Sequence, residues 1–311
     1  MKKLNIDTVL IEMSPYSLLI YLLLKNQREL EKTLFIFNEG INLEIIKEFK
    51  KSFENIYVFK KANKKYKKID ICINYLKYII FLRKVPKNVN IYSKLNLIIS
   101  YPFKKLEKNY IEEGKENPYY FHEKNKEIKK IKKIYLTENA KIKEFLKNKI
   151  ERIDLKELWN KKSQEEKKKI LELYNVKKDE IENLNGKKNI LLTQPIEEHG
   201  SISEEYKVNL YKRILKGFKM KDTIIKKHPR DKTDYEQYFE EATVLNSVFP
   251  IEILDFLEVK FENVITLCST GALNIKAKNL YYWGTEFDEK LEKEFGKVKN
   301  ITILGGKESV K

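Results

Sequence analysis

The fold is decided by an amino-terminal stretch, TVLIEMSPY, at residues 8–16. A short β-type run, Thr8–Met13, leads directly into Ser14-Pro15-Tyr16. Serine at a cap position and proline in the first helical turn are start signals for a helix. We therefore expect Ser17–Lys25 to be helical. A strand that runs straight into a helix begins a β-α-β unit, which indicates an α/β protein.

The same alternation continues along the first half of the chain. Strands are expected at Thr33–Phe37, Asn55–Phe59, Val89–Ser93 and Leu97–Ser100, and helices at Leu43–Phe53 and Ile69–Leu82. Residues 123–188 are rich in Lys and Glu and mostly helical in pattern, with one strand predicted at Lys133–Leu136. Strands and helices in alternation favour an open parallel sheet.

After Asn185-Gly186 the alternation starts again. Strands are expected at Asn189–Thr193, Thr223–Lys227, Thr243–Leu245, Asn263–Cys268, Leu280–Trp283 and, as the last strand, Ile301–Leu304. Helices are expected at Ser203–Phe218, Pro250–Leu257 and Asp288–Phe295. The sequence predicts a GT-B-like α/β fold, with two Rossmann-type domains facing a central cleft. The expected bounds are 1–155 for the first domain, 156–188 for a helical linker and 189–311 for the second domain.

Charge is distributed unevenly along the 311 residues. Lys and Arg number 63 against 46 Asp and Glu, a formal net charge of +17, and residues 1–150 hold 33 basic and 17 acidic residues. Such an excess suggests a polyanionic partner. The basic residues form no known nucleic-acid motif, so a nucleic-acid-binding protein is the weaker alternative. The other hypothesis is that the first half faces an anionic membrane surface. Its alternative is that the Lys residues have accumulated on solvated helices without a binding role.

Several classes of protein are excluded by what the sequence lacks. There is no GxGxxG or Walker A loop, which argues against nicotinamide-dependent dehydrogenases and P-loop proteins. No HExxH or dense cluster of ligand side chains occurs, so we expect neither a metal nor a cofactor. Two distant cysteines and no apolar run of about 20 residues favour a soluble cytoplasmic protein. It would be attached at most peripherally, at the inner face of the cytoplasmic membrane.

Candidate anion-binding residues lie in the second half. His228, in IIKKHPRD at 224–231, follows a strand, and ligands bind at the carboxyl ends of strands in such sheets. Lys226 adds positive charge that suits a phosphate, and Pro229 ends the strand. Ser269-Thr270-Gly271 follows another strand, where its hydroxyls and N–H groups would open a helix and bind an anion. A surface histidine and a simple helix cap are the alternatives.

Carboxylates supply the other candidates. Glu112-Glu113-Gly114 offers paired acids for general-base work beside a glycine that permits close approach, although a solvated loop is the alternative. Glu252 begins a helix and could accept from ribose hydroxyls, or serve only the helix dipole. Further side chains expected at strand ends, lining the cleft, are Ser14, Gln194, Glu197 and Glu198.

The order of these motifs resembles that of bacterial sialyltransferases. Those enzymes share an acidic pair before glycine, a His-Pro pair and a Ser-Ser/Thr pair, present here at 112–114, 228–229 and 269–270. The opening VLIEMSPYSLL at 9–19, LLTQP at 191–195 and KHPRD at 227–231 resemble the lipooligosaccharide sialyltransferases of glycosyltransferase family 52. The polysialyltransferases and marine-type sialyltransferases share the three-motif set.

The resemblance implies an inverting, metal-independent transfer from CMP-sialic acid to a galactose-type hydroxyl of a lipooligosaccharide or capsule glycan. The first domain would then hold the glycan or glycolipid acceptor, and the second would bind the CMP-sugar. Glu112 would be the base with Glu113 beside it, or else Glu197 or Glu198 would serve. The donor phosphate and ribose would be held by His228, Lys226, Ser269, Thr270 and Glu252. A GT-B transferase using another nucleotide sugar is the alternative.

Overall fold

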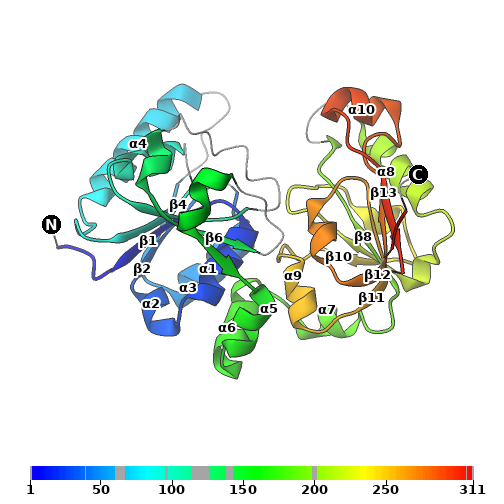
Figure 1. Cartoon of the computed structure of the whole chain (residues 1–311), viewed down its shortest axis with the longest axis horizontal. Helices are drawn as coiled ribbons and strands as arrows, with labels where there is room; N and C mark the ends of the chain where they lie inside the picture. The colour runs from blue at the N-terminus through cyan, green and yellow to red at the C-terminus, as the bar shows by residue number, and fades with distance from the viewer. Residues whose placement is uncertain are drawn as a thin grey trace. The chain divides into compact units, whose positions relative to one another are not determined.

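The computed structural model describes residues 2–38, 40–59, 67–94, 97–113, 126–137, 143–197, 202–305 and 307–309 (Figure 1). The chain divides into two compact units, Met1–Asn175 (unit 1) and Val176–Lys311 (unit 2). Each unit is an α/β domain built on one sheet with a mainly parallel strand order. The predicted α/β class with two Rossmann-type domains is therefore confirmed.

Unit 1 contains a parallel sheet in the order β3-β2-β1-β4-β5-β6-β7. Both faces of a parallel sheet are covered, so its central strands are expected to be mainly apolar. The strands β1 and β2 are buried along their whole length. The strands are β1 (Thr8–Glu12), β2 (Thr33–Phe37), β3 (Ile56–Val58), β4 (Asn90–Ser93), β5 (Lys108–Ile111), β6 (Ile131–Thr137) and β7 (Ile150–Ile153).

Helices cover both faces of this sheet. Leu34 and Ile36 of β2 pack in one core cluster with Tyr78 of the helix α4. On the other face, Phe35 meets Phe49 of α3 with ring centroids 5.2 Å apart. The helices of unit 1 are α1 (Pro15–Leu24), α2 (Gln27–Glu31), α3 (Leu43–Ser52), α4 (Lys67–Leu82), α5 (Leu155–Lys161) and α6 (Gln164–Leu173). Side-chain alternation in β2 thus decides which helix covers which face.

The predicted helix start at Ser14-Pro15 is confirmed. The Ser14 hydroxyl accepts a hydrogen bond of 3.4 Å from the N–H of Ser17, and Pro15 is the first helical residue. Proline at this position loses no hydrogen bond, because the first N–H groups of a helix lack partners within it. The strand β1 therefore stops at Glu12 and the chain turns immediately into α1.

Unit 2 repeats the same strand order. Its sheet runs β10-β9-β8-β11-β12-β13-β14, and β13 and β14 pair in antiparallel fashion at one edge. The strands are β8 (Asn189–Leu192), β9 (Thr223–Lys226), β10 (Thr243–Leu245), β11 (Phe261–Thr266), β12 (Ala277–Tyr282), β13 (Ile301–Leu304) and β14 (Lys307–Ser309). The helices are α7 (Lys178–Glu182), α8 (Glu204–Ile214), α9 (Glu252–Phe256) and α10 (Glu289–Phe295).

Some sequence-based predictions were wrong. Residues 97–100 do not form a strand; Ile98–Phe103 is a 3₁₀ helix, in which the Ser100 hydroxyl donates to the carbonyl of Leu97 at 2.8 Å. Short apolar runs do not distinguish a strand from a helical turn. The strand at Ile301–Leu304 is not the last, because β14 follows it.

Two strands of unit 1, β5 and β7, were not predicted, because polar and charged residues interrupt their apolar pattern. In β5, Lys108 and Asn109 are 2% and 7% exposed, so polar letters stand at buried positions. In β7, Glu151 is partly exposed and pairs with Lys133 of the neighbouring strand β6 at 2.5 Å. An edge strand with solvated charges reads as a Lys/Glu-rich helix when only one sequence is available.

The segment expected to be a linker contains three short helices. The first two, α5 and α6, lie within unit 1, and α7 lies within unit 2. Among the described residues, no helix is both long and apolar enough to cross a membrane.

Candidate active site

Both sheets reverse their strand order at one point. In unit 1 the reversal falls between β1 and β4, and in unit 2 it falls between β8 and β11. Ligands of open α/β sheets bind outside the carboxyl ends of the strands at such a point. We therefore expect the site residues of each unit to lie at the carboxyl edge of its own sheet.

At the carboxyl edge of unit 1, four neighbouring strands each contribute polar side chains. Glu12 ends β1, Lys94 follows β4, Glu112 and Glu113 follow β5, and Thr137 ends β6. Glu12 and Lys94 are 2% and 8% exposed. Charged groups are rarely so buried without partners, and these two lie at the point where the strand order reverses.

Lys94 connects two carboxylates in this group. Its ammonium nitrogen lies 3.8 Å from Oε2 of Glu12 and also forms an ion pair with Glu113. Burial raises the pKa of Glu12, although Lys94 and two backbone N–H groups oppose the rise. Burial lowers the pKa of Lys94. The side chain of Glu113 is 27% exposed, so it can reach a ligand that the buried Glu12 cannot.

Glu112 occupies a different environment from its neighbour. It is 1% exposed, and its carboxylate accepts from the Tyr16 hydroxyl at 2.8 Å and from the N–H and hydroxyl of Thr137, each at 2.7 Å. Its backbone carbonyl accepts from the Ser17 hydroxyl at 2.7 Å. These bonds hold the turn after β5, in which Glu113 follows Glu112. Gly114 lies outside the described residues.

In unit 2, the loop after β9 presents His228 in a fixed orientation. Its Nδ1 accepts from the N–H of Arg230 at 3.1 Å, and its own N–H donates to the hydroxyl of Thr193 at 3.1 Å. Because Nδ1 accepts, the neutral ring carries its proton on Nε2. Burial lowers the pKa of His228 to about 4, and the positive charges of Arg230 and Lys226 add to this effect. The ring is thus a neutral donor at pH 7.

The carboxylate of Asp231 holds this loop in place through hydrogen bonds. It accepts from the Thr193 hydroxyl at 2.6 Å, the Tyr235 hydroxyl at 2.8 Å, the ammonium of Lys207 at 3.0 Å and the N–H of Thr233 at 3.1 Å. The side chains of Lys207 and Asp231 are both fully buried. A buried carboxylate needs this number of donors to offset the loss of water. The predicted residue Pro229 is exposed in the turn.

Lys226, the last residue of β9, is 5% exposed. Its ammonium donates to the carbonyl of Ser247 at 2.6 Å and lies 4.5 Å from the ring centroid of Phe249. Burial lowers the pKa of Lys226 to about 8, and the carboxylates of Glu180 and Glu252 oppose the shift. A bound anion would favour the charged form, which suits Lys226 to a phosphate.

Glu252 begins α9 and is connected to the loop after β11. It is 8% exposed, and its Oε1 accepts from the side-chain amide of Asn274 at 2.7 Å. Asn274 ends a five-residue 3₁₀ helix, Thr270–Asn274, that follows Ser269. The α-helix start expected there is thus a short 3₁₀ turn, and the Ser269 side chain makes no capping bond. Ser269, Thr270 and Gly271 remain partly exposed beside β8 and β11.

Other predicted residues fall around the same two edges. Ser14 caps α1, and its N–H donates to Glu12 at 3.3 Å. The N–H of Gln194 donates to the Tyr211 hydroxyl at 2.7 Å. Glu197 is within 3.4 Å of Lys207, and its side chain is 38% exposed. Glu198 lies outside the described residues.

Sequence reasoning missed four charged residues of the two edges: Glu12, Lys94, Lys207 and Asp231. One signal was available, because Lys207 stands one turn before Tyr211 and two turns before Ile214 on the apolar stripe of α8. A lysine on a buried stripe requires an acidic partner, and Asp231 three residues after His228 is such an acid. Among the described residues, no group of three or more His, Cys, Asp and Glu side chains has the arrangement of a metal site.

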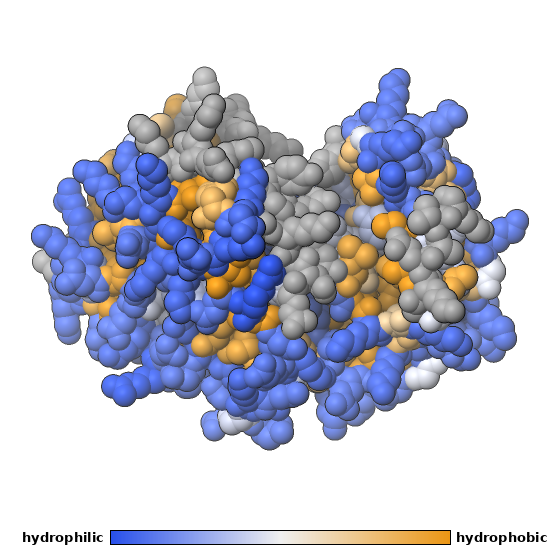
Figure 2. All heavy atoms as spheres, in the orientation of Figure 1, coloured by the Kyte–Doolittle hydropathy of each residue, from blue (hydrophilic) through white to orange (hydrophobic). Residues whose placement is uncertain are grey.

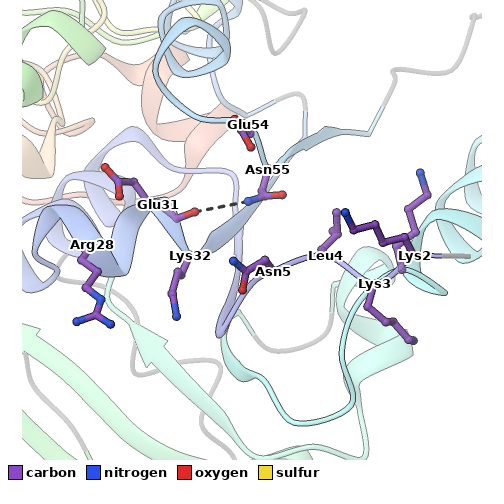
Figure 3. A pocket seen from close by; sticks show the side chains of 10 residues that line it. Lys2, Lys3, Leu4, Asn5, Arg28, Glu31, Lys32, Glu54 and Asn55 are labelled. Carbon is purple, nitrogen blue, oxygen red and sulfur yellow. Dashed lines mark hydrogen bonds between the residues drawn. The ribbon is translucent and has the colours of Figure 1, made fainter.

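A cavity outlined in Figure 3 lies elsewhere in unit 1. Its lining residues precede β1, β2 and β3 or follow α4, and they include Lys3, Arg28, Lys32 and Lys84. These positions are at the amino ends of the strands, whereas the candidate site lies at the carboxyl ends. The cavity is therefore not part of the site.

Two α/β domains of this kind make up the GT-B fold, and the family match below shows that the chain is a glycosyltransferase. A sequence profile described as Glycosyltransferase family 52 matches residues 28–287, and the chain belongs to that family. A protein of Haemophilus influenzae described as uncharacterized is 32% identical over 304 residues, covering 91% of this chain and 95% of its own length.

Solved structures of bacterial sialyltransferases share the fold. The GT-B domain of a sialyltransferase from Photobacterium damselae has a TM-score of 0.57 at 12% identity, covering 86% of this chain and 88% of that chain. A 2,6-sialyltransferase from a Photobacterium species, solved with CMP and lactose, has a TM-score of 0.57 at 11% identity, covering 85% and 68%. An α2,3-sialyltransferase from Photobacterium phosphoreum gives 0.51 at 13% identity, covering 91% of each chain.

The low pKa of His228 predicts how stability depends on pH. The folded pKa is about 4, below an unfolded value of about 6.5, so the unfolded chain binds more protons between these values. We expect the free energy of unfolding to fall as pH decreases from about 6.5 to 4, and the slope to decrease in His228→Gln. An NMR titration that gave a midpoint near 6.5 for the His228 ring, assigned with that variant, would contradict this.

The Lys207–Asp231 pair predicts strong energetic coupling. We expect Asp231→Asn and Lys207→Met each to cost about 3–5 kcal/mol, because each leaves one buried charge without its partner. The double variant should cost less than the sum of the two. Urea unfolding followed by Trp283 fluorescence in a Trp159→Phe background reports on unit 2.

A matched control in unit 2 is the exposed pair Lys178–Glu182, at 3.5 Å on α7. Glu182→Gln should change stability by only about 0.5 kcal/mol. Additive costs for Asp231→Asn and Lys207→Met would show that the two side chains do not act as a pair.

Proposed function

We propose that this chain is an inverting sialyltransferase that uses CMP-sialic acid. The acceptor would be a galactose-type hydroxyl of a lipooligosaccharide or capsule glycan. Two findings support the proposal: membership of glycosyltransferase family 52, and a fold shared with sialyltransferases, one of which was solved with CMP and lactose. The observation that carries it is the neutral His228 ring, held at a strand edge with a donor Nε2–H.

Unit 2 would bind the donor. His228 would donate from Nε2 to the phosphate oxygen of CMP, and Lys226 would become fully charged beside it. Ser269 and Thr270 would donate hydroxyls to the same phosphate, and Glu252 would accept from the ribose. Preorganised donors of this kind stabilise charge that develops in the transition state. They also take the role that a metal ion plays in other transferases, so we propose a metal-independent reaction.

The reaction exchanges one bond for another at the anomeric carbon of sialic acid. The bond from this carbon to the phosphate oxygen breaks, and its electron pair leaves on CMP. The acceptor oxygen forms the new bond from the opposite face, which inverts the configuration. Its proton must pass to a base, and removal of that proton by a positioned carboxylate contributes typically about 10²–10⁴ in rate.

We propose Glu113 as this base. Glu112 has its carboxylate engaged by three donors and is buried, whereas Glu113 is partly exposed and paired with Lys94. The ammonium of Lys94 lies against the carboxylate of Glu113. Glu197 is the alternative in unit 2, where Lys207 would play the corresponding part.

The proposal predicts turnover of CMP-sialic acid that depends on His228. Incubation with CMP-sialic acid and lactose-type acceptors should give a sialylated product in the presence of EDTA. His228→Ala should lower kcat by about 10²–10³, because the leaving phosphate loses its donor, with little change in melting temperature. The exposed Lys232 of the same loop offers a matched control, Lys232→Ala, which should retain kcat.

Two outcomes would contradict the function. Turnover of a UDP-sugar but not of CMP-sialic acid would assign a different donor to the same fold. An unchanged kcat in His228→Ala would remove the residue from the mechanism.

The same substitution, Glu→Gln, should have different effects at Glu113 and at Glu112. We expect Glu113→Gln to lower kcat by about 10²–10⁴ with unchanged stability. Glu112→Gln should instead lower the free energy of unfolding by about 1–3 kcal/mol, because its amide group faces the N–H of Thr137. Loss of kcat in Glu197→Gln with full activity in Glu113→Gln would place the base in unit 2.

A further inference from the structure

The helix α4 of unit 1, drawn in cyan in Figure 1, carries an apolar stripe on its solvent side. The stripe comprises Ile69, Ile73, Leu76 and Ile80, which are 61%, 45%, 61% and 47% exposed. These residues follow the spacing i, i+4, i+7, i+11 and so lie in one line along the helix. Most of the face in Figure 2, by contrast, is hydrophilic.

The opposite side of α4 fixes the direction of the stripe. Tyr78 is fully buried, and its hydroxyl donates to the carbonyl of Ile99 at 2.7 Å. Its ring lies 5.2 Å from that of Tyr57, which lies 4.6 Å from Phe81. Rotation of α4 to bury the stripe would break these contacts. The stripe is therefore a permanent surface feature of unit 1.

The apolar surface continues onto the 3₁₀ helix that contacts α4. Ile98 and Tyr101 are 69% and 55% exposed. Burial raises the pKa of Tyr75 on α4, and the nearby Tyr101 adds to this effect. The ammonium of Lys104 lies 3.8 Å from the Tyr101 ring centroid. Isolated exposed apolar side chains are normal, whereas a contiguous group of this kind marks an interaction surface.

The sequence around α4 is rich in basic residues. Residues 60–105 contain thirteen Lys and Arg residues and one acidic residue, Asp70. At the carboxyl end of α4, the ammonium of Lys3 donates to the carbonyls of Arg83 and Val85 at 2.8 and 3.1 Å. Lys2, Lys3 and Lys84 line the cavity there (Figure 3). Lys50 and Lys77 line a second cavity beside α4.

We propose that α4 and its basic surroundings dock unit 1 onto an anionic lipid bilayer. An apolar helix face with basic flanks lies in the plane of a membrane interface, where apolar burial and attraction to anionic headgroups add together. A second copy of the chain is a poorer occupant, because symmetric pairing would bring two equally basic faces together. Four side chains are also few for a stable protein interface.

This inference concerns binding and does not need the proposed reaction. Its consequence for function does rest on the proposed function: a docked transferase would meet a glycolipid acceptor at the surface where that acceptor is presented. Vesicle binding and turnover of soluble acceptors are separate measurements, so failure of one leaves the other standing.

The test is co-sedimentation of the full chain with vesicles. We expect binding to vesicles with about 30 mol % phosphatidylglycerol, weaker binding at high salt and little binding to neutral phosphatidylcholine. Ile73→Gln with Leu76→Gln should lower the partition coefficient about tenfold, because the apolar contribution is lost. The exposed Leu43 of α3, 78% exposed, offers a matched control, Leu43→Gln, which should bind as the unmodified chain does.

A second readout uses Cys72, an exposed free thiol on α4. An environment-sensitive fluorophore at Cys72, in a Cys268→Ser background, should shift to shorter wavelength with anionic vesicles. Absence of vesicle binding would overturn the proposal. Equal binding by the double variant would show that charge attraction alone causes the binding. This result would also overturn the proposal. A dimer that dissociates in the double variant, without vesicle binding, would assign the stripe to a second copy.

Discussion

The buried carboxylate of Asp231 is the interaction on which the candidate donor site depends. It joins three elements that are distant in sequence, because Thr193 follows β8, Lys207 lies on α8 and Tyr235 follows the loop after β9. Thr193 links Asp231 to His228, because its hydroxyl donates to Asp231 and accepts from the backbone N–H of His228. The position of the His228 ring is thereby set by a buried ion pair rather than by the exposed loop that carries it.

A corresponding arrangement supports the other strand edge. In unit 1, Lys94 lies between Glu12 and Glu113, at the reversal point of a sheet with the same strand order as that of unit 2. In both units, a buried lysine pairs with a buried carboxylate next to a more exposed acid, either Glu113 or Glu197. Low dielectric surroundings strengthen such interactions.

The sequence predicted the fold where a strand was mainly apolar or a helix carried a clear start signal. Thr33–Phe37 is such a strand, and Ser14-Pro15 is such a start signal. Prediction failed where tertiary contacts overrode the local pattern, as in β5, whose Lys108 and Asn109 are buried. The motif residues His228 and Glu112 could be identified from one sequence. Their hydrogen-bond partners Thr193 and Thr137 could not, because parallel-sheet register brings these pairs together across 35 and 25 residues.

The central claim is that His228 meets the phosphate of CMP, and calorimetric titration with CMP in buffers of different ionisation enthalpy tests it most directly. The free ring has a pKa of about 4, and a neighbouring phosphate must raise it. At a pH of about 5, binding of CMP should therefore take up a proton, and His228→Ala should abolish that uptake. Binding of CMP with no proton uptake, or with the same uptake in His228→Ala, would contradict the account.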